Sequence, residues 1–360
     1  MKTETVPEGA APLVPTDRRR RLPRLQELGL VLVILIMGTV LSIFGYIDTK
    51  PGQRNLFLNS DNLIGQVATS MSYYAIMAVG MTLVIVSGGI DISVGSTMAL
   101  AGLGAAGVLQ RMQLNAPPWQ VLPVALAVPM GIGLLCGLAN GLLIVGLDVH
   151  PFIVTLGTLS IFRCIAVVTP SVATLPSAGN YLPVAFADHF MRLEIWGVRP
   201  MPMVIMLVVV AIGWFYLSQT VGGREIYAVG GNEEAARFSG IRTRRVKLRV
   251  YVIAGLTASI AGMVSLGRFG AISTNSASGY ELTVVAAAVV GGASLSGGRG
   301  SAIGALLGAL VLAIIEDGIV TMRWPSEYRL GIVGSAIIVA VGIDRLSETM
   351  RARRTLRATP

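Results

Sequence analysis

The chain has 360 residues, of which 53% are hydrophobic and only 13% are charged. A soluble domain carries about 25% charged residues, so this composition is typical of a polytopic membrane protein. The formal net charge of +9 comes from Lys and Arg clustered beside apolar segments, not from a basic stripe interleaved with aromatic residues, and nucleic acid is therefore excluded as the partner.

Residues 1–27 are polar and carry four prolines and the run Arg18 to Arg21, a composition that predicts a disordered cytoplasmic tail. The apolar run from Leu28 to Ile47 is long enough to cross a bilayer. The residues around its end, SIFGYIDTK, contain no small-residue cleavage site for a signal peptidase. We therefore expect an uncleaved first membrane helix.

Apolar segments recur along the rest of the chain, and together with the first helix they make about ten. They lie at 28–47, 63–86, 96–111, 120–146, 151–169, 200–218, 250–268, 282–296, 301–320 and 329–344. The expected fold is all-α, with one transmembrane domain over 28–346 and a second basic tail over 347–360. An even number of spans puts both termini on one side. The segment 282–296 falls short of the about 20 apolar residues that a span needs, so a broken or re-entrant helix is the alternative there.

The interval from Thr220 to Arg249 is long, polar and strongly charged, and it lies between two apolar spans. Its basic residues are Arg224, Arg237, Arg242, Arg244, Arg245, Lys247 and Arg249. An excess of Lys and Arg in short loops marks the cytoplasmic side of a membrane protein. The loop 220–249 and both termini are therefore predicted to be cytoplasmic.

Within this loop the sequence predicts a short helix from Glu233 to Ser239. Asn232 is suited to cap its first turn, and Gly240 can supply the left-handed residue that follows a helix. A helix of about 10 Å is not stable alone in water, so it needs a surface on which to dock. The other interpretation, from composition alone, is an ordinary solvated connection.

Glycines also follow patterns. Gly133, Gly137 and Gly141 form one ladder at intervals of four, and Gly300, Gly304 and Gly308 form another; such ladders predict close helix packing. The pattern Val86-x-Gly88-Gly89-x3-Ser93-x-Gly95 recurs from Val289 to Gly298, which indicates either an internal duplication or chance in a glycine-rich chain.

Catalytic and metal-binding motifs are missing from the sequence. No glycine precedes a lysine as in a phosphate-binding loop, His150 and His189 are the only histidines, and Cys136 and Cys164 lie in apolar segments. We therefore expect no enzyme, no metal site and no cofactor in this chain. The carboxylates are expected at turns or helix ends, with Asp91 capping the turn before the third helix.

Four polar residues within the apolar segments are candidates to line a path for a neutral polyhydroxy solute: Tyr73, Asn140, Thr155 and Arg163. Arg163 either reaches the headgroups or faces a polar cavity. Each of the other three can equally form a hydrogen bond between helices.

Four motifs, in order, carry a resemblance over roughly residues 60 to 345. They are GGIDISVGS at 88–96, HPFIVTLGTLSI at 150–161, AVGGNEEAARFSGI at 228–241 and VVGGASLSGGRGS at 289–301. Together they resemble the permease subunit of ATP-binding-cassette (ABC) importers for monosaccharides, the branch with ribose and xylose permeases. The basic N-terminal tail has no counterpart in that pattern.

The resemblance implies a bacterial inner-membrane protein that forms a homo- or heterodimer of permeases. It also implies a cytoplasmic ATP-binding-cassette subunit that uses ATP and Mg²⁺, and a periplasmic sugar-binding protein. The family's coupling motif matches here, so the expected ATPase contacts are Asn232, Glu233, Ala235, Ala236, Ser239 and Gly240. Alternatives are a permease for nucleosides or branched-chain amino acids, and an ATP-independent carrier.

Overall fold

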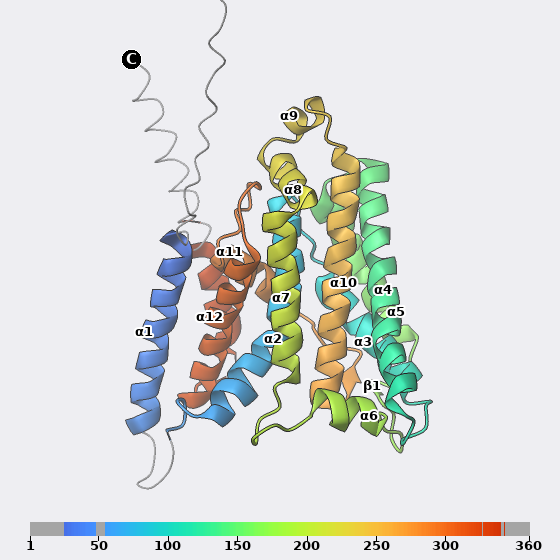
Figure 1. The fold of residues 1–360 in the computed structure, drawn as a ribbon, viewed down its shortest axis with the longest axis vertical. Coiled ribbons are helices and arrows are strands. Elements are labelled where there is room, and N and C mark those ends of the chain that lie inside the picture. The colour runs from blue at the N-terminus through green and yellow to red at the C-terminus, as the bar shows by residue number, and fades with distance from the viewer. Residues whose placement is uncertain (1–24, 48–54, 326, 340–341, 343–360) are drawn as a thin grey trace, which may run out of the picture.

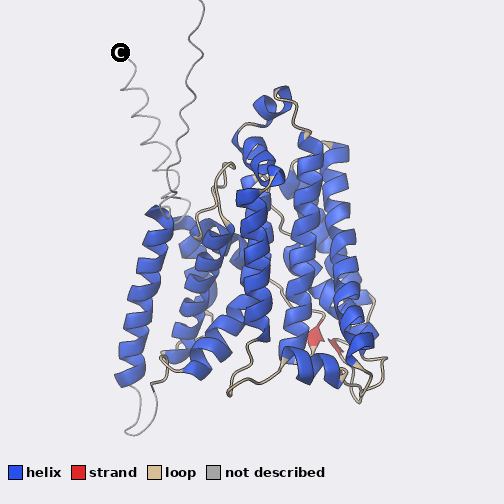
Figure 2. Cartoon of the chain, viewed as in Figure 1, coloured by secondary structure: helices blue, strands red, loops and turns tan. Residues whose placement is uncertain are grey.

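The computed structural model describes residues 25–47, 55–325, 327–339 and 342, and it forms a bundle of roughly parallel helices (Figure 1). The described part is mostly helical, and a single pair of two-residue strands lies at one end (Figure 2). The expected tail 347–360, and all of the first tail before residue 25, lie outside the described residues.

The elements follow in chain order. They are α1 (Leu25–Ile47), the π-helix η1 (Asp61–Ala68), α2 (Thr69–Val86), α3 (Val94–Leu109), α4 (Pro118–Leu147), α5 (Pro151–Val168), β1 (Thr174–Leu175), α6 (Val184–Phe186), the π-helix η2 (Ala187–Met191), α7 (Met201–Gln219), α8 (Val221–Gly231), α9 (Glu233–Phe238), α10 (Thr243–Phe269), β2 (Ile272–Ser273), α11 (Tyr280–Val290), α12 (Ala302–Thr321) and a short apolar helix over Tyr328–Val339.

Each of the ten expected apolar segments contains a helix, but three of these helices are short. In the described part, 7 helices are long and apolar enough to cross a membrane. The shorter ones are α3, α11 and Tyr328–Val339. At 11 residues α11 is about 16 Å long, against a hydrocarbon core of about 30 Å. The helix expected over 282–296 therefore ends at Val290, and the residues that follow form a loop.

Helices α2 and α10 form the centre of the bundle. In α2 every residue from Met71 to Val86 is buried, so its burial extends all the way round the helix. α10 packs against α4, α2 and α3. A helix that is apolar on all faces belongs in the interior of a large bundle. By contrast, only 11% of the apolar stretch of α1 is buried, and α1 lies against α12 at the margin of the bundle.

One glycine ladder packs as expected. A Cβ at Gly133 would lie 2.4 Å from the carbonyl oxygen of Gly255, and one at Gly137 would lie 2.5 Å from that of Tyr251, so α4 and α10 touch backbone to backbone. Gly304 and Gly308 of α12 approach α11 in the same way. Gly300 differs from the prediction, because it precedes α12, whose N-cap is Ser301.

Asp91 is more deeply placed than the sequence indicated. It is 2% exposed, in the linker that leads from the end of α2 to α3, and its Oδ1 accepts hydrogen bonds from the backbone N–H of Ser93 (2.9 Å) and the Ser93 hydroxyl (2.7 Å). Asp91 therefore closes the turn before α3, but the N-cap of α3 is Ser93 and has no side-chain cap hydrogen bond, so the expected capping of the helix by Asp91 is not observed. Asp91 does lie at a turn, as expected, and it is buried because the linker returns into the bundle and α3 begins inside it (Figure 1).

The recurring glycine pattern corresponds to two similar helix ends. After α2, Gly88 has φ +88° and Gly89 N–H donates to Val84; after α11, Gly292 has φ +97° and Ala293 N–H donates to Ala288. Both are left-handed caps in which two backbone N–H groups satisfy the last carbonyls of the helix. The caps align Gly88 with Gly292, one residue away from the alignment that the sequence pattern indicated.

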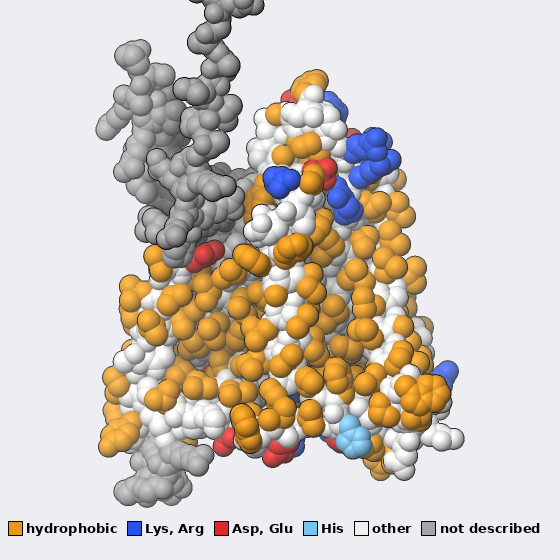
Figure 3. Space-filling model, viewed as in Figure 1, with side chains coloured by type: hydrophobic (Ala, Val, Ile, Leu, Met, Phe, Trp, Pro, Cys, Tyr) orange, Lys and Arg blue, Asp and Glu red, His pale blue; other side chains and the backbone are white. Residues whose placement is uncertain are grey.

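Side-chain chemistry divides the surface into zones. Hydrophobic side chains cover the middle of the bundle, and Lys and Arg gather where α8, α9 and the start of α10 lie, which we call the α9 end (Figure 3). The far end of α10, with the two strands, is the opposite end (Figure 1). A broad apolar belt with charges beyond it is what a lipid bilayer requires of a protein that crosses it.

Candidate functional sites at the two ends of the bundle

The short helix α9 forms as its sequence predicts. The Asn232 side chain accepts a hydrogen bond from the backbone N–H of Ala235 at 2.9 Å. At the other end Gly240 has φ +85°, and its N–H and that of Ile241 donate to Arg237 and Ala236. Both ends are thereby capped, which compensates for the small number of hydrogen bonds within six residues.

The residues expected to contact an ATPase do not all face the same way. Glu233, Ala235, Ser239 and Gly240 are exposed, whereas Ala236 is 5% exposed and packs into the core. Phe238 lies beside them with 78% of its surface exposed. A large exposed ring on a capped helix is the kind of anchor that fills a pocket on a partner. Contact through Ala236 remains a prediction, and its burial indicates that it seats α9 on its own chain.

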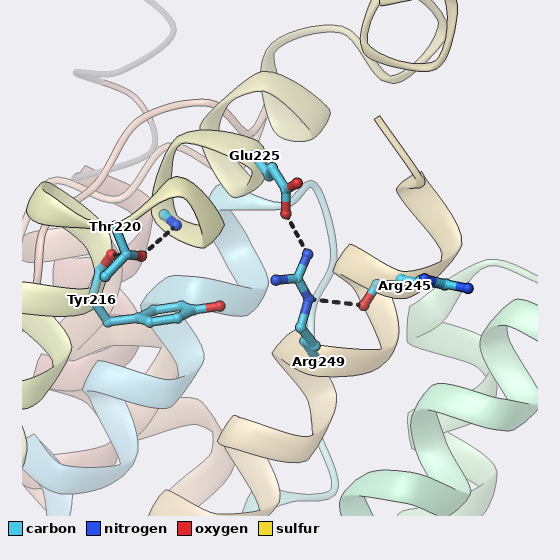
Figure 4. Close-up of polar contacts among 6 residues, drawn as sticks. Tyr216, Thr220, Glu225, Arg245 and Arg249 are labelled. Atoms are coloured by element: carbon cyan, nitrogen blue, oxygen red, sulfur yellow. Dashed lines mark hydrogen bonds and ion pairs between the residues drawn. The ribbon is translucent and has the colours of Figure 1, made fainter. Parts of the chain in front are cut away.

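The polar interval before α9 is helical, which the sequence analysis missed. α8 begins at Thr220, whose hydroxyl accepts a hydrogen bond from Gly223 N–H (3.1 Å) and donates one to the Tyr216 carbonyl (2.7 Å) (Figure 4). A threonine that can cap the N–H group three residues later is the sequence signal for the start of α8, and Thr220 provides it. The basic residues from Arg244 onward lie on the first turns of α10 and not in a loop.

Two ion pairs tie these helices together. Arg249 of α10 pairs with Glu225 of α8, and its Nε also donates to the Arg245 carbonyl (Figure 4). Lys247 of α10 pairs with Glu233 of α9 at 2.7 Å. Segments α8, α9 and the start of α10 therefore form one unit, which we call the coupling hairpin.

The coupling hairpin rests on the bundle through glycines. A Cβ at Gly230 of α8 would lie 1.6 Å from the carbonyl oxygen of Val86, the last residue of α2, and 2.7 Å from the nitrogen of Gly298. The N–H of Gly298 donates to that same Val86 carbonyl at 2.9 Å. We call this meeting of α8, α2 and the loop after α11 the glycine junction. The Tyr227 hydroxyl adds a hydrogen bond to the Gly300 carbonyl at 2.7 Å.

Two of the four candidate path residues are engaged in the interior. Asn140 donates to the Ser93 hydroxyl at 2.8 Å and accepts from Thr158 at 2.6 Å. Thr155 donates to the Ile90 carbonyl at 3.3 Å. Both side chains hold the linker that carries Asp91, so the structure places them as supports of that linker. A role in lining a path stays a prediction for them.

The other two candidates lie toward the opposite end. Arg163 donates from Nη1 to the carbonyls of Thr274 and Ser276, at 3.1 and 2.8 Å, and so holds the loop after β2. Tyr73 stacks on Tyr280 with ring centroids 5.8 Å apart and an interplanar angle of 11°. No sequence pattern singles out Tyr280, because the proximity of Tyr73 and Tyr280 depends on how α2 and α11 pack.

An ion pair flanks these aromatic rings. Arg329 Nε lies 2.7 Å from Glu316 Oε1, the Arg329 guanidinium also contacts the Tyr74 hydroxyl, and it lies over the rings of Tyr74 and Tyr280 at 5.6 and 5.8 Å. Arg268 is close by, and its Nη1 is buried without a hydrogen-bond partner among the described residues. Long side chains meet here, and close glycine contacts lie near them, since a Cβ at Gly95 would lie 2.6 Å from the Ala277 carbonyl oxygen.

The apolar belt, the buried central helices and the short helices packed through glycine define a multi-pass helical membrane protein. A family model described as "Branched-chain amino acid transport system / permease component" matches residues 63–341, and the chain belongs to that family.

Curated relatives carry more specific names. The ribose import permease protein of Bacillus subtilis is 36% identical over 325 residues, covering 89% of this chain and 93% of the relative. The D-allose transport system permease protein of Escherichia coli is 33% identical over 315 residues, covering 86% and 90%. The xylose transport system permease protein of Escherichia coli is 32% identical over 375 aligned positions, covering 89% and 93%. The comparison with solved structures found no match. Membership of this family and the apolar helices make the chain a multi-pass protein of the bacterial inner membrane.

Proposed function

We propose that this chain is the permease subunit of an ATP-binding-cassette importer, and that it forms the membrane path for a monosaccharide or polyol. The observation that carries this proposal is the similarity, over almost nine-tenths of the chain, to permeases named for ribose, D-allose and xylose. The family description mentions branched-chain amino acids, but the named relatives favour a sugar. A hydroxyl-rich substrate also suits the uncharged polar side chains inside the bundle.

The coupling hairpin is the proposed docking site of the cytoplasmic ATPase subunit, which would use ATP and Mg²⁺. This chain would carry out no hydrolysis itself. Supporting the proposal are the capped helix α9 and the exposed Phe238, beside the basic residues that mark a cytoplasmic face. The opposite end would then face the periplasm and receive the sugar from a binding protein. Both termini would be cytoplasmic, with ten membrane-embedded segments.

The glycine junction supplies a physical route for coupling. When the ATPases close on nucleotide, they displace α9, and α8 moves with it because the two are joined at Asn232. Gly230 is in direct contact with the end of α2 and with the loop after α11. Backbone-to-backbone contacts leave little room for slippage, since close-packed interiors transmit strain. A second permease, identical or related, would complete the path.

The test is to co-purify the permease with its ATPase subunit and reconstitute both in proteoliposomes with the binding protein. We expect uptake of one or more pentoses, hexoses or polyols only when ATP and the binding protein are present. Uptake of leucine or a nucleoside in place of sugars would refute the substrate class. Uptake by the permease alone would show an ATP-independent carrier.

A further inference from the structure

A cavity of about 260 Å³ opens at the opposite end of the bundle, between α3, α10 and the loop that contains β2. Its lining comes from five separate segments: Met98, Thr174, Ser265, Phe269, Ala271, Ile272, Ser273, Ser276, Ala277 and Tyr280. Pockets for drug-sized ligands span about 300 to 1,000 Å³. A cavity slightly below that range suits a smaller molecule.

The side chains that line the cavity suit a neutral polyhydroxy ligand. Four hydroxyl side chains, those of Thr174, Ser265, Ser273 and Ser276, are interspersed with the aromatic residues Phe269 and Tyr280, and none of the lining residues is charged. A hydroxyl both donates and accepts, so it can pair with a ligand hydroxyl in either sense. An aromatic face packs against the C–H face of a sugar ring.

Two of these hydroxyls are free to bind. Those of Thr174 and Ser265 make no hydrogen bond to any described residue, although Ser265 is only 7% exposed. The Ser276 and Ser273 oxygens accept from the backbone N–H groups of Ser273 and Asn275, at 2.9 and 3.1 Å, and each keeps its own proton to donate. The cavity can therefore offer both donors and acceptors.

Contacts with other side chains hold the Tyr280 ring in position. Tyr280 stacks on Tyr73, and the Arg329 guanidinium lies over the Tyr280 ring. Arg163 holds the carbonyls of Thr274 and Ser276, and Thr174 pairs with Ser273 across the two strands. A lining held by contacts outside the cavity is pre-organised, which reduces the conformational entropy lost on binding.

Helix α11 connects this cavity to the glycine junction. Tyr280 is its first residue, and the loop after its last residue packs on Gly230 through Gly297 and Gly298. A displacement of α8 is thus transmitted to the aromatic wall along about 16 Å of rigid helix.

We propose that this cavity is a monosaccharide-binding subsite of the translocation path, with Tyr280 as the stacking platform and Ser265 as a hydroxyl partner. The proposal rests on the transport function above and adds a position at which the sugar binds on its way through the membrane. Movement of α11 changes the shape of the subsite during each transport cycle.

The first test compares Tyr280→Ala with Tyr280→Phe in the complete reconstituted complex. Tyr280→Ala removes the ring and is expected to lower sugar uptake about tenfold, the equivalent of one lost aromatic contact. Tyr280→Phe keeps the ring and should retain several times more uptake than Tyr280→Ala. Tyr328→Ala is the matched control, because Tyr328 is 57% exposed and does not line the cavity. Co-purification with the ATPase subunit shows that each variant assembles.

The second test measures occupancy without relying on the rate of transport. Ser265→Cys, in a background of Cys164→Ala, is reacted with a small membrane-impermeant thiosulfonate in the assembled complex. Ribose, xylose or allose should slow the reaction, and leucine at the same concentration should not. Ser278→Cys is the control, because Ser278 is exposed on the same loop but does not line the cavity.

The outcomes separate the subsite from the proposed function. Protection of Ser265→Cys by a transported sugar, together with loss of uptake in Tyr280→Ala, supports the subsite. A complex that imports a sugar while Tyr280→Ala is unaffected and Ser265→Cys is unprotected overturns the subsite and leaves the importer function intact. Protection and uptake with leucine alone would overturn both.

Discussion

The glycine junction at the α9 end and the aromatic cluster at the opposite end are built from different kinds of contact. At the α9 end, Gly230, Val86 and Gly298 meet through backbone atoms alone. At the opposite end, Tyr73, Tyr280 and Arg329 meet through rings and a guanidinium. Backbone contacts cannot change rotamer, so they suit the transmission of a displacement. Long side chains can adjust, so they suit the accommodation of a ligand. The molecule thus separates movement from recognition.

The largest effect is expected where the backbone contact is closest. Gly230→Ala places a Cβ 1.6 Å from the Val86 carbonyl oxygen and must push α8 off the bundle. Overpacking costs up to about 3 kcal/mol, or roughly a hundredfold, and we expect ATP-dependent uptake to fall by that order. Gly231→Ala is the matched control, since a Cβ there meets nothing within 4 Å. Equal uptake in the two variants would contradict transmission through the glycine junction.

Ala236→Glu should have the next largest effect, and it should weaken docking of the ATPase subunit. Ala236 is 5% exposed beneath α9, so a carboxylate there must either stay buried without a partner or turn the helix away. Burying such a group costs about 2 kcal/mol or more, and we expect the recovery of ATPase subunit with the purified permease to drop roughly thirtyfold. Membrane insertion should be unchanged. Normal recovery of the ATPase would show that α9 is not the docking element.

A substitution at the opposite end should lower the stability of the permease and leave docking of the ATPase subunit unchanged. Glu316→Gln leaves Arg329 without its carboxylate partner, in a pair whose side chains are 20% and 32% exposed. Because solvent screens part of this pair, we expect a loss of about 1.5 kcal/mol in the free energy of unfolding. Thermal unfolding of the purified permease measures it, and the double variant with Arg329→Gln should recover part of the loss. Recovery of the ATPase subunit should stay unchanged, and a parallel loss would erase the contrast between the two ends.

How far the sequence predicts these features depends on how local they are. The cap at Asn232 and the left-handed Gly240 involve neighbours in the chain, and both are confirmed. Helix α8 was missed because its glycines, among them Gly222 and Gly230, disfavour a helix by about 1 kcal/mol each. Tertiary contacts override that preference at Gly222 and Gly230, since both lie against another part of the chain.

Non-local features lay beyond the sequence altogether. No pattern pairs Gly230 with Val86, because they come from helices far apart in the chain. The depth of Asp91 also depends on packing, because no local pattern shows that the glycine turn leads into a linker that returns inside the bundle. Asn140 was a sound choice as a polar residue, yet its partners Ser93 and Thr158 were knowable only from the packing.

A smaller effect is expected from the helix cap. Asn232→Ala removes the side-chain acceptor of Ala235 N–H, which costs about 1 kcal/mol. The fraction of α9 in its docked form should fall about fivefold, which binding of the ATPase subunit to the permease in detergent can measure. Asn232→Asp keeps a capping oxygen and is expected to bind close to normally. Equal weakening by both variants would mean that the amide, and not the cap, contacts the ATPase.

The smallest effect is expected for the ion pair between Lys247 and Glu233. Its side chains are 25% and 49% exposed, so water and salt screen the attraction. An exposed pair contributes about 0.2 to 1 kcal/mol, and Glu233→Gln should weaken ATPase binding by about twofold at low salt and not at all near 1 M salt. A tenfold loss that persists at high salt would instead place Glu233 in direct contact with the ATPase. The capped backbone of α9 would then share the docking role with a specific charge, and the α9 end would also recognise its partner through side chains.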